Sequence, residues 1–213
     1  MRIGILGTGG VGQTIGSALV QRGHDVKLGS RSATNEKAAE WVKQNGERAS
    51  QGTFADAAAF GDIVFNCTSG KTSLDALRAA TAEHLAGKTL ADVANALDFS
   101  SGSLTLTVAN TDSLAEQIQA AFPKTSVVKT LNTVNADVMV NPSLVAGEHD
   151  VFVAGNDAAA KTQVSELLRS FGWRNIVDLG DISAARGLEM YLPLWMRLFG
   201  TLKTPHLNIH VAR

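Results

Sequence analysis

Short apolar runs and longer amphipathic stretches alternate along the chain, with glycine, proline or polar residues between them. A short apolar run is typical of a buried strand, whereas apolar residues that recur every three or four positions indicate a helix with one buried face. Strands are predicted at 2–6, 25–29, 63–67, 90–93, 127–131, 151–154 and 176–179. Helices are predicted at 11–21, 35–44, 54–60, 73–85, 113–122, 158–171 and 184–199. The expected fold class is therefore α/β: a Rossmann-type, doubly wound parallel sheet with a short C-terminal helical extension.

Two stretches are less regular than the rest. Residues 104, 106 and 108 are apolar and alternate as in a strand, but the preceding Ser-Ser-Gly-Ser favours an extended loop over 99–110. Pro193 interrupts the last predicted helix, and a short strand-like tail follows it.

The 213 residues suffice for one domain plus a short appendage. We expect residues 1–180 to form the Rossmann domain, and 181–213 to form a helix and tail without an independent fold.

A glycine-rich turn separates the first predicted strand from the first predicted helix. Gly7, Gly9 and Gly12 have G-x-G-x-x-G spacing, which permits a tight turn, close approach of the backbone to a pyrophosphate, and close packing of helix on strand. Free N–H groups at such a helix start favour phosphate. With 20 glycines in the chain the spacing could arise by chance. The strand, helix and second strand around it favour a dinucleotide site, which also includes Thr8, Gly10 and Val11.

The end of the second predicted strand indicates which dinucleotide binds. NAD enzymes usually place an acid there, but this chain has Ser30 and Arg31; Asp25 is at the other end of the strand and Glu36 lies beyond the turn. A guanidinium and a hydroxyl can bind a 2′-phosphate, and no carboxylate repels it. The sequence therefore predicts NADP(H) in preference to NAD. Lys37 either adds a further positive charge to this site or is a solvated lysine on an exposed helix face.

Charge and cysteine content narrow the possible partners. The 19 basic and 20 acidic residues are mixed along the chain, so neither nucleic acid nor an anionic membrane surface is an expected partner. The most membrane-like stretch, 187–202, is too short to span a bilayer and contains charged residues. A single cysteine, Cys67, excludes an internal disulfide and suits a reducing compartment. The chain starts with a core strand and no leader, so we expect a cytoplasmic location without a signal peptide.

Few side chains have the pattern of a catalytic site. A nicotinamide cofactor carries its own hydride chemistry, whereas reduction of a carbonyl also needs a proton donor. Tyr191, the only tyrosine, is followed four residues later by Trp195, so the Tyr-x-x-x-Lys pair is missing. His206 and His210 would lie about 13 Å apart in an extended tail. Cys67 has no adjacent base and is expected to be a core residue. We predict no catalytic side chain and no metal site.

Five segments carry a resemblance to known oxidoreductases: GILGTGGVGQTIGSAL, LGSRSATNEKAAE, LADVANAL, VVKTLNTVNADVM and IVDLGDISAARGLEMYLPLW. The chain resembles the NADP oxidoreductase family that depends on the 8-hydroxy-5-deazaflavin coenzyme. It also resembles the cytosolic reductase domain of the six-transmembrane metalloreductases. The resemblance implies a 2′-phosphate clamp, a wall along the cofactor and a nicotinamide side. The clamp would be Thr8, Ser30, Arg31 and Lys37, the wall Thr68 and Ser69, and the nicotinamide side Asn95, Ala96, Asn132 and Thr133.

The acceptor is less constrained than the cofactor. In the deazaflavin enzymes a proline-containing segment stands in place of Asn95-Ala96 and an Ile-Pro pair in place of Thr133-Val134, which implies a changed acceptor pocket here. The expected activity is hydride transfer between NADP(H) and a flat small-molecule acceptor, either deazaflavin or flavin. Two alternatives stay open. One is a non-catalytic NADP-binding sensor, and the other is a reductase of a small carbonyl or imine.

The apolar C-terminal helix has more large side chains than a free surface helix tolerates. Two interpretations stay open: it covers the acceptor pocket of a second copy in a homodimer, or it folds back on its own sheet. The residues concerned are Leu188, Tyr191, Leu192, Leu194, Trp195, Met196, Leu198 and Phe199.

Overall fold

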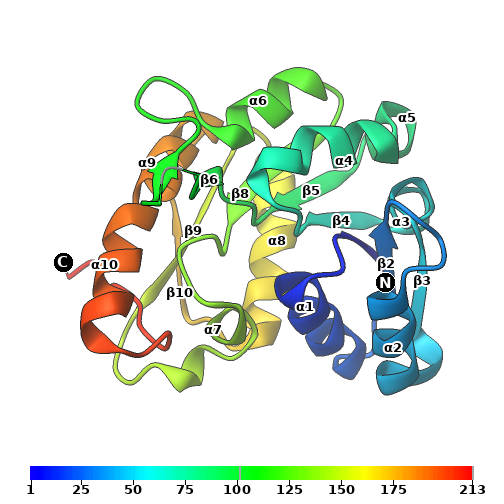
Figure 1. The fold of residues 1–213 in the computed structure, drawn as a ribbon, viewed down its shortest axis with the longest axis horizontal. Coiled ribbons are helices and arrows are strands. Elements are labelled where there is room, and N and C mark those ends of the chain that lie inside the picture. The colour runs from blue at the N-terminus through cyan, green and yellow to red at the C-terminus, as the bar shows by residue number, and fades with distance from the viewer. Residues whose placement is uncertain (101, 213) are drawn as a thin grey trace.

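An eight-stranded sheet in the order β10-β9-β8-β5-β4-β1-β2-β3 runs through the molecule, with helices packed on both of its faces (Figure 1). The computed structural model describes residues 1–100 and 102–212. The strands of this sheet are β1 Arg2–Leu6, β2 Asp25–Ser30, β3 Ala49–Thr53, β4 Ile63–Asn66, β5 Thr89–Asp92, β8 Ser126–Thr130, β9 Asp150–Gly155 and β10 Asn175–Asp178. The helices are α1 Gly10–Gln21, α2 Glu36–Asn45, α3 Phe54–Phe60, α4 Ser73–Ala80, α5 Ala82–Leu85, α6 Leu114–Ala121, α7 Ala136–Val140, α8 Ala158–Phe171, α9 Ala185–Met190 and α10 Leu192–Leu202.

The predicted doubly wound α/β fold is confirmed, with one correction to the strand directions. Neighbouring strands are parallel except β8 and β9, which are antiparallel, with Thr130 opposite Val153. The connection between these two strands holds only α7 and a 3-10 turn, Pro142–Leu144. Two parallel strands need a crossover that returns the chain to the end of the sheet where the first strand began, whereas two antiparallel strands can be joined by a short connection at one end. The chain order changes direction between β1 and β4, the place where ligands bind in such sheets.

Alternation along β1 explains why helices cover both faces. Ile3 and Ile5 join one buried cluster with residues of α1, α2 and α8. Leu6 joins the second cluster, which contains residues of α3, α4 and α6. Gly4 lies between them on the α3 side, where a Cβ would come within 2.2 Å of the Ala57 carbonyl oxygen. The sequence of this central strand thus fixes both the layers and the close approach of α3.

Several elements of the structure differ from those predicted from the sequence. Residues 49–53 form the edge strand β3, although the sequence Ala-Ser-Gln-Gly-Thr has no apolar run. The predicted helix 73–85 divides into α4 and α5 at Thr81, whose φ of 67° and ψ of 141° lie outside the helical region. Within 99–110, where an extended loop was expected, Thr105–Leu106 (β7) pairs with Leu97–Asp98 (β6) as a small antiparallel ladder.

The C-terminal segment also differs from its prediction. The single interrupted helix is two helices, α9 and α10, which meet at Tyr191. The tail beyond α10 contains no strand over 203–212, although Asp150 N donates a hydrogen bond of 3.0 Å to the Ile209 carbonyl. In the described part of the chain, no helix is both long and apolar enough to cross a membrane.

Candidate dinucleotide-binding site

The glycine-rich turn lies between the end of β1 and the start of α1. Gly7 has φ 118°, and a Cβ there would lie 2.7 Å from the Cys67 carbonyl oxygen. A Cβ on Gly12 would lie 2.4 Å from the Gly7 carbonyl oxygen, so this residue lets α1 pack on the turn. A Cβ on Gly9 would meet no atom within 4 Å. Gly7 and Gly12 are therefore required by the fold, whereas the space at Gly9 is open to a ligand.

The first turn of α1 has free backbone donors. Its N-cap, Gly9, contributes no side-chain hydrogen bond to the helix start. The first amides of a helix have no partner within the helix and favour an anion. Thr8, Gly10 and Val11 surround this point and are all at least partly exposed. The backbone here fits a pyrophosphate group.

The loop after β2 lies beside the glycine turn, because Gly7 N donates a hydrogen bond of 2.9 Å to the Gly29 carbonyl. The Ser30 side chain is buried, and its hydroxyl donates to the Ser32 carbonyl at 2.6 Å. Arg31 is exposed, and among the described residues its guanidinium makes no ion pair or hydrogen bond. Lys37 is exposed in the first turn of α2. Arg31 is thus available to a ligand, whereas the Ser30 hydroxyl also shapes its own loop.

The loop after β4 carries the predicted wall along the cofactor. The Thr68 hydroxyl donates to Asn66 Oδ1 at 2.7 Å and lies 2.8 Å from the Ser73 hydroxyl. Ser69 is exposed next to it. Burial and the charge of Asp92 raise the pKa of the Cys67 thiol, which therefore stays protonated and uncharged.

Asn95 and Asn132 face each other across two strand ends. Asn95 Nδ2 donates to the Asn132 carbonyl, and Asn132 Nδ2 donates to Asn95 Oδ1, each at 3.0 Å. Asn132 Nδ2 also donates to the Leu188 carbonyl of α9 at 2.9 Å. Asn132 is 2% exposed, and its buried Oδ1 has no hydrogen-bond partner among the residues that the structure describes. A buried acceptor without a partner is costly.

The other residues of the predicted nicotinamide side lie on the same two loops. Ala96 is 2% exposed and Thr133 is 3% exposed. Leu131, next to Asn132, has φ 60°, which is strained for a residue with a branched side chain. A Cβ on Gly70 would lie 2.3 Å from the Asn95 carbonyl oxygen, so the loop after β4 packs directly on the loop after β5. The structure therefore brings these predicted loops together.

A buried ion-pair cluster, which no motif in the sequence predicted, lies behind these loops. Lys129 Nζ lies 2.8 Å from Asp92 Oδ2 and 2.9 Å from Glu189 Oε1, and all three side chains are at most 2% exposed. Burial alone would lower the pKa of Lys129, but the two facing carboxylates raise it, so the ammonium is charged. A lysine within the apolar run of β8 was the available signal, because a buried charge needs a partner.

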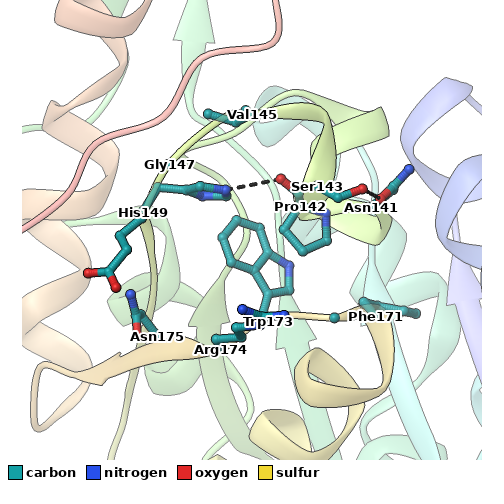
Figure 2. Close-up of a pocket in the computed structure, with 12 residues that line it drawn as sticks. Asn141, Pro142, Ser143, Val145, Gly147, His149, Phe171, Trp173, Arg174 and Asn175 are labelled. Atoms are coloured by element: carbon teal, nitrogen blue, oxygen red, sulfur yellow. Dashed lines mark hydrogen bonds between the residues drawn. The ribbon is translucent and has the colours of Figure 1, made fainter.

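A cavity of about 530 Å³ lies elsewhere, beyond α7, and shares no residue with the predicted site (Figure 2). Pro142, His149 and Trp173 form part of its wall. His149 Nε2 lies 3.0 Å from the Pro142 carbonyl, and Trp173 Nε1 donates to the Met139 carbonyl at 2.9 Å. These groups are occupied by the protein itself. Among the described residues, no group of three or more His, Cys, Asp or Glu side chains is placed to hold a metal ion.

The family model described as NADP oxidoreductase, coenzyme F420-dependent, matches residues 2–96. A crystal structure from Arthrobacter sp. FB24, with the provisional name F420-dependent NADP-reductase, is 50% identical, covers 100% of both chains and superposes with a TM-score of 0.95. The chain belongs to this family. The prediction of that family from the sequence is confirmed, and with it a place among NADP-dependent oxidoreductases.

More distant relatives are longer proteins that match this chain over part of their length. The metalloreductase STEAP3 of Rattus norvegicus is 30% identical over 97% of this chain, which spans only 38% of that relative. A reductive aminase from Aspergillus terreus, solved with NADPH and ethyl levulinate, has a TM-score of 0.68 at 18% identity and covers 95% of this chain and 63% of its own. The second likeness is one of fold.

Proposed function

We propose that the protein binds NADPH and transfers hydride between it and a flat flavin-type acceptor, either a deazaflavin or a flavin. The observations that support this proposal are the exposed Arg31 guanidinium in the loop after β2, the open space at Gly9 in the neighbouring glycine turn, and the absence of a carboxylate at the end of β2. A 2′-phosphate needs such a cation, and a pyrophosphate needs such a space. The family model and the 50% identical Arthrobacter protein support the same cofactor and acceptor class.

We assign the adenosine half of the cofactor to the glycine turn and to the loop after β2. The backbone of residues 7–12 would bind the pyrophosphate. Thr8, Ser30, Arg31 and Lys37 would surround the 2′-phosphate, with Arg31 as the principal contact. The Ser30 hydroxyl would exchange its bond to the Ser32 carbonyl for one to the phosphate.

The nicotinamide half is assigned to the loops after β4, β5 and β8. Thr68 and Ser69 would line one side of it, and Ala96 and Thr133 another. Asn132 Oδ1, buried without a partner, would accept a hydrogen bond from the carboxamide, while Asn95 holds the Asn132 side chain in place. Bound NADPH supplies the hydride. The protein's part is to hold the ring flat, exclude water and leave one ring face open to the acceptor.

A flat acceptor fits a site without an acid or base. A flavin or deazaflavin ring takes the hydride directly, whereas a small carbonyl or imine also needs a nearby proton donor. The residues assigned to the nicotinamide side are amides, hydroxyls and an alanine, none of which titrates near neutral pH. The absence of an acid or base among these assigned residues favours the flat acceptor.

The test is a turnover assay with a panel of acceptors. Protein and NADPH are mixed with the deazaflavin coenzyme, FMN, FAD or a ferric chelate, and the loss of NADPH absorbance is followed; NADH serves as the matched donor control. We expect oxidation of NADPH, faster than that of NADH, with at least one flavin-type acceptor. Tight NADPH binding with no turnover on any acceptor would reject the enzyme and favour a cofactor-binding sensor.

The exposed apolar helix α10 supports a homodimer as part of this proposal. Leu194 is 54% exposed and Leu202 is 57% exposed, and Leu192 is the buried residue of the helix. The helix lies at the edge of the molecule in Figure 1. Stable interfaces bury about 800 Å² on each partner. We propose that residues 181–213, an extension of the domain formed by 1–180, cover the acceptor pocket of a second copy.

Light scattering tests the dimer. Leu194→Glu combined with Leu202→Glu should convert a dimer to a monomer, because charges would be buried in an apolar contact. Leu144→Glu is the matched control, since Leu144 is also an exposed leucine (40%) but lies in the turn after α7. A monomeric wild type at micromolar concentration would refute the dimer.

The single cysteine supports a reducing compartment, and we propose the cytoplasm as the location of the protein.

A further inference from the structure

The buried ammonium of Lys129 binds three different segments at the carboxyl edge of the sheet. It donates to Asp92 Oδ2 at the end of β5 and to the Ala94 carbonyl in the following loop. Its third contact is Glu189 Oε1 of α9, 2.9 Å away. A lysine has three N–H donors, and here each one has an acceptor. Lys129 is therefore fully bonded inside the protein and has no donor left for a ligand.

Two of these contacts lead directly to residues assigned to the cofactor. Asp92 Oδ1 accepts a hydrogen bond of 2.7 Å from Asn66 Nδ2, and Asn66 Oδ1 accepts one of 2.7 Å from the Thr68 hydroxyl. The Ala94 carbonyl immediately precedes Asn95 in the chain. Hydrogen bonds thus connect both the Thr68 loop and the Asn95 loop to one cation.

The third contact leads to the remaining loop. Glu189 follows Leu188, whose carbonyl accepts the hydrogen bond from Asn132 Nδ2. The Glu189 carboxylate also accepts from two backbone amides of the first turn of α6, those of Leu114 at 2.8 Å and Ala115 at 3.2 Å. Through Lys129, α9 is held against β8, and Asn132 is held against α9.

Each charged group of this arrangement has a partner. One ammonium and two carboxylates are buried together, and the second negative charge faces the amides at the start of α6, where a helix favours an anion. Loss of the ammonium would leave both carboxylates facing each other without a counter-charge, so the segments that carry them would separate. A second ion pair, Arg186 with Glu116, also joins α9 to α6, but Arg186 is 37% exposed.

We propose that Lys129 is a positioning residue, which fixes the Thr68, Asn95 and Asn132 loops in the arrangement that holds the nicotinamide for hydride transfer. This proposal rests on the proposed function. It assigns Lys129 no contact with cofactor or acceptor. A misplacement of about 1 Å can cost about 10²-fold in rate, so a rigid support behind these loops has a direct effect on turnover.

The experiment compares two ligands on three variants. NADPH occupies both halves of the site, whereas 2′-phosphoadenosine 5′-diphosphoribose lacks the nicotinamide and occupies only the adenosine half. The variants are Lys129→Met, Glu189→Gln and, as the matched control, Arg186→Met, which removes the other ion pair of α9. Calorimetry gives both dissociation constants, and circular dichroism checks that each variant is folded.

We expect Lys129→Met and Glu189→Gln to raise the NADPH dissociation constant by about tenfold or more while changing that of the fragment by less than about twofold. Arg186→Met should change neither. Equal weakening of both ligands, or no weakening of either in a folded variant, would overturn the positioning role. If Lys129→Met does not fold, Glu189→Gln decides, because it keeps the shape of the side chain. A wild type that binds neither ligand would reject the proposed function itself.

Discussion

The glycine turn should respond in opposite ways to alanine at two positions. In Gly12→Ala the new Cβ would lie 2.4 Å from the Gly7 carbonyl oxygen, so α1 must move away from the turn. Such overpacking costs roughly 1–3 kcal/mol. For a domain of this size that lowers Tm by roughly 2–12 °C. In Gly9→Ala the Cβ meets no atom within 4 Å, and φ is −80°, which any residue adopts. Its stability should change by less than about 1 kcal/mol, because the lower chain entropy of the unfolded state favours alanine whereas glycine is the better N-cap.

Cofactor binding should separate the same two variants. The Gly9→Ala methyl group would occupy the approach of the pyrophosphate. Loss of one charge-assisted hydrogen bond costs about 1.5–3 kcal/mol. The NADPH dissociation constant should then rise about 10- to 150-fold with little change in Tm. Thermal unfolding and calorimetry on each variant measure both effects. Equal loss of stability in the two variants would refute the packing argument, and wild-type affinity in Gly9→Ala would refute the placement of the pyrophosphate.

Three further predictions concern single side chains. Arg31→Ala should weaken NADPH about 10- to 150-fold and leave NADH unchanged in calorimetry, because only the 2′-phosphate loses a charged partner; a parallel loss for NADH would contradict this. The Cys67 thiol, whose pKa is raised by burial and by Asp92, should be alkylated far more slowly in native protein than in urea, as followed by mass spectrometry. Hydrogen bonds from Lys71 and Ser100 lower the pKa of Asp98 to about 2. Its contact with Lys71 should therefore persist as pH falls below the ordinary carboxyl range and be lost only near about 2 in an NMR titration, whereas Lys71→Met should return that pKa toward its ordinary value.

The unit made of β1, the glycine turn and α1 could be predicted because its determinants are local. The apolar run of β1, the glycines after it and the amphipathic α1 each follow from neighbouring residues. The structure gives these elements nearly the predicted bounds. β3 could not be predicted in this way, because its five residues form a strand only by pairing with β2, with Leu28 opposite Gln51. The reversal of β9 likewise depends on pairing with β8.

The residues of the candidate site also divide into those that local sequence predicts and those that only the folded chain brings together. The spacing of Gly7, Gly9 and Gly12 and the missing acid after β2 are visible in the sequence alone. The cluster of Lys129, Asp92 and Glu189 is not, because its members lie on β8, β5 and α9 and meet only in the folded chain. A charged residue inside an apolar strand signals that a partner exists but does not identify it.

The most direct test of NADP(H) binding through Arg31 is a calorimetric titration of the unmodified protein with NADPH and with NADH under the same conditions. If Arg31 binds the 2′-phosphate, NADPH should bind about tenfold more tightly or better, as expected for one charge-assisted contact. NADH that binds as tightly as NADPH would contradict the assignment of the loop after β2, and with it the proposed cofactor.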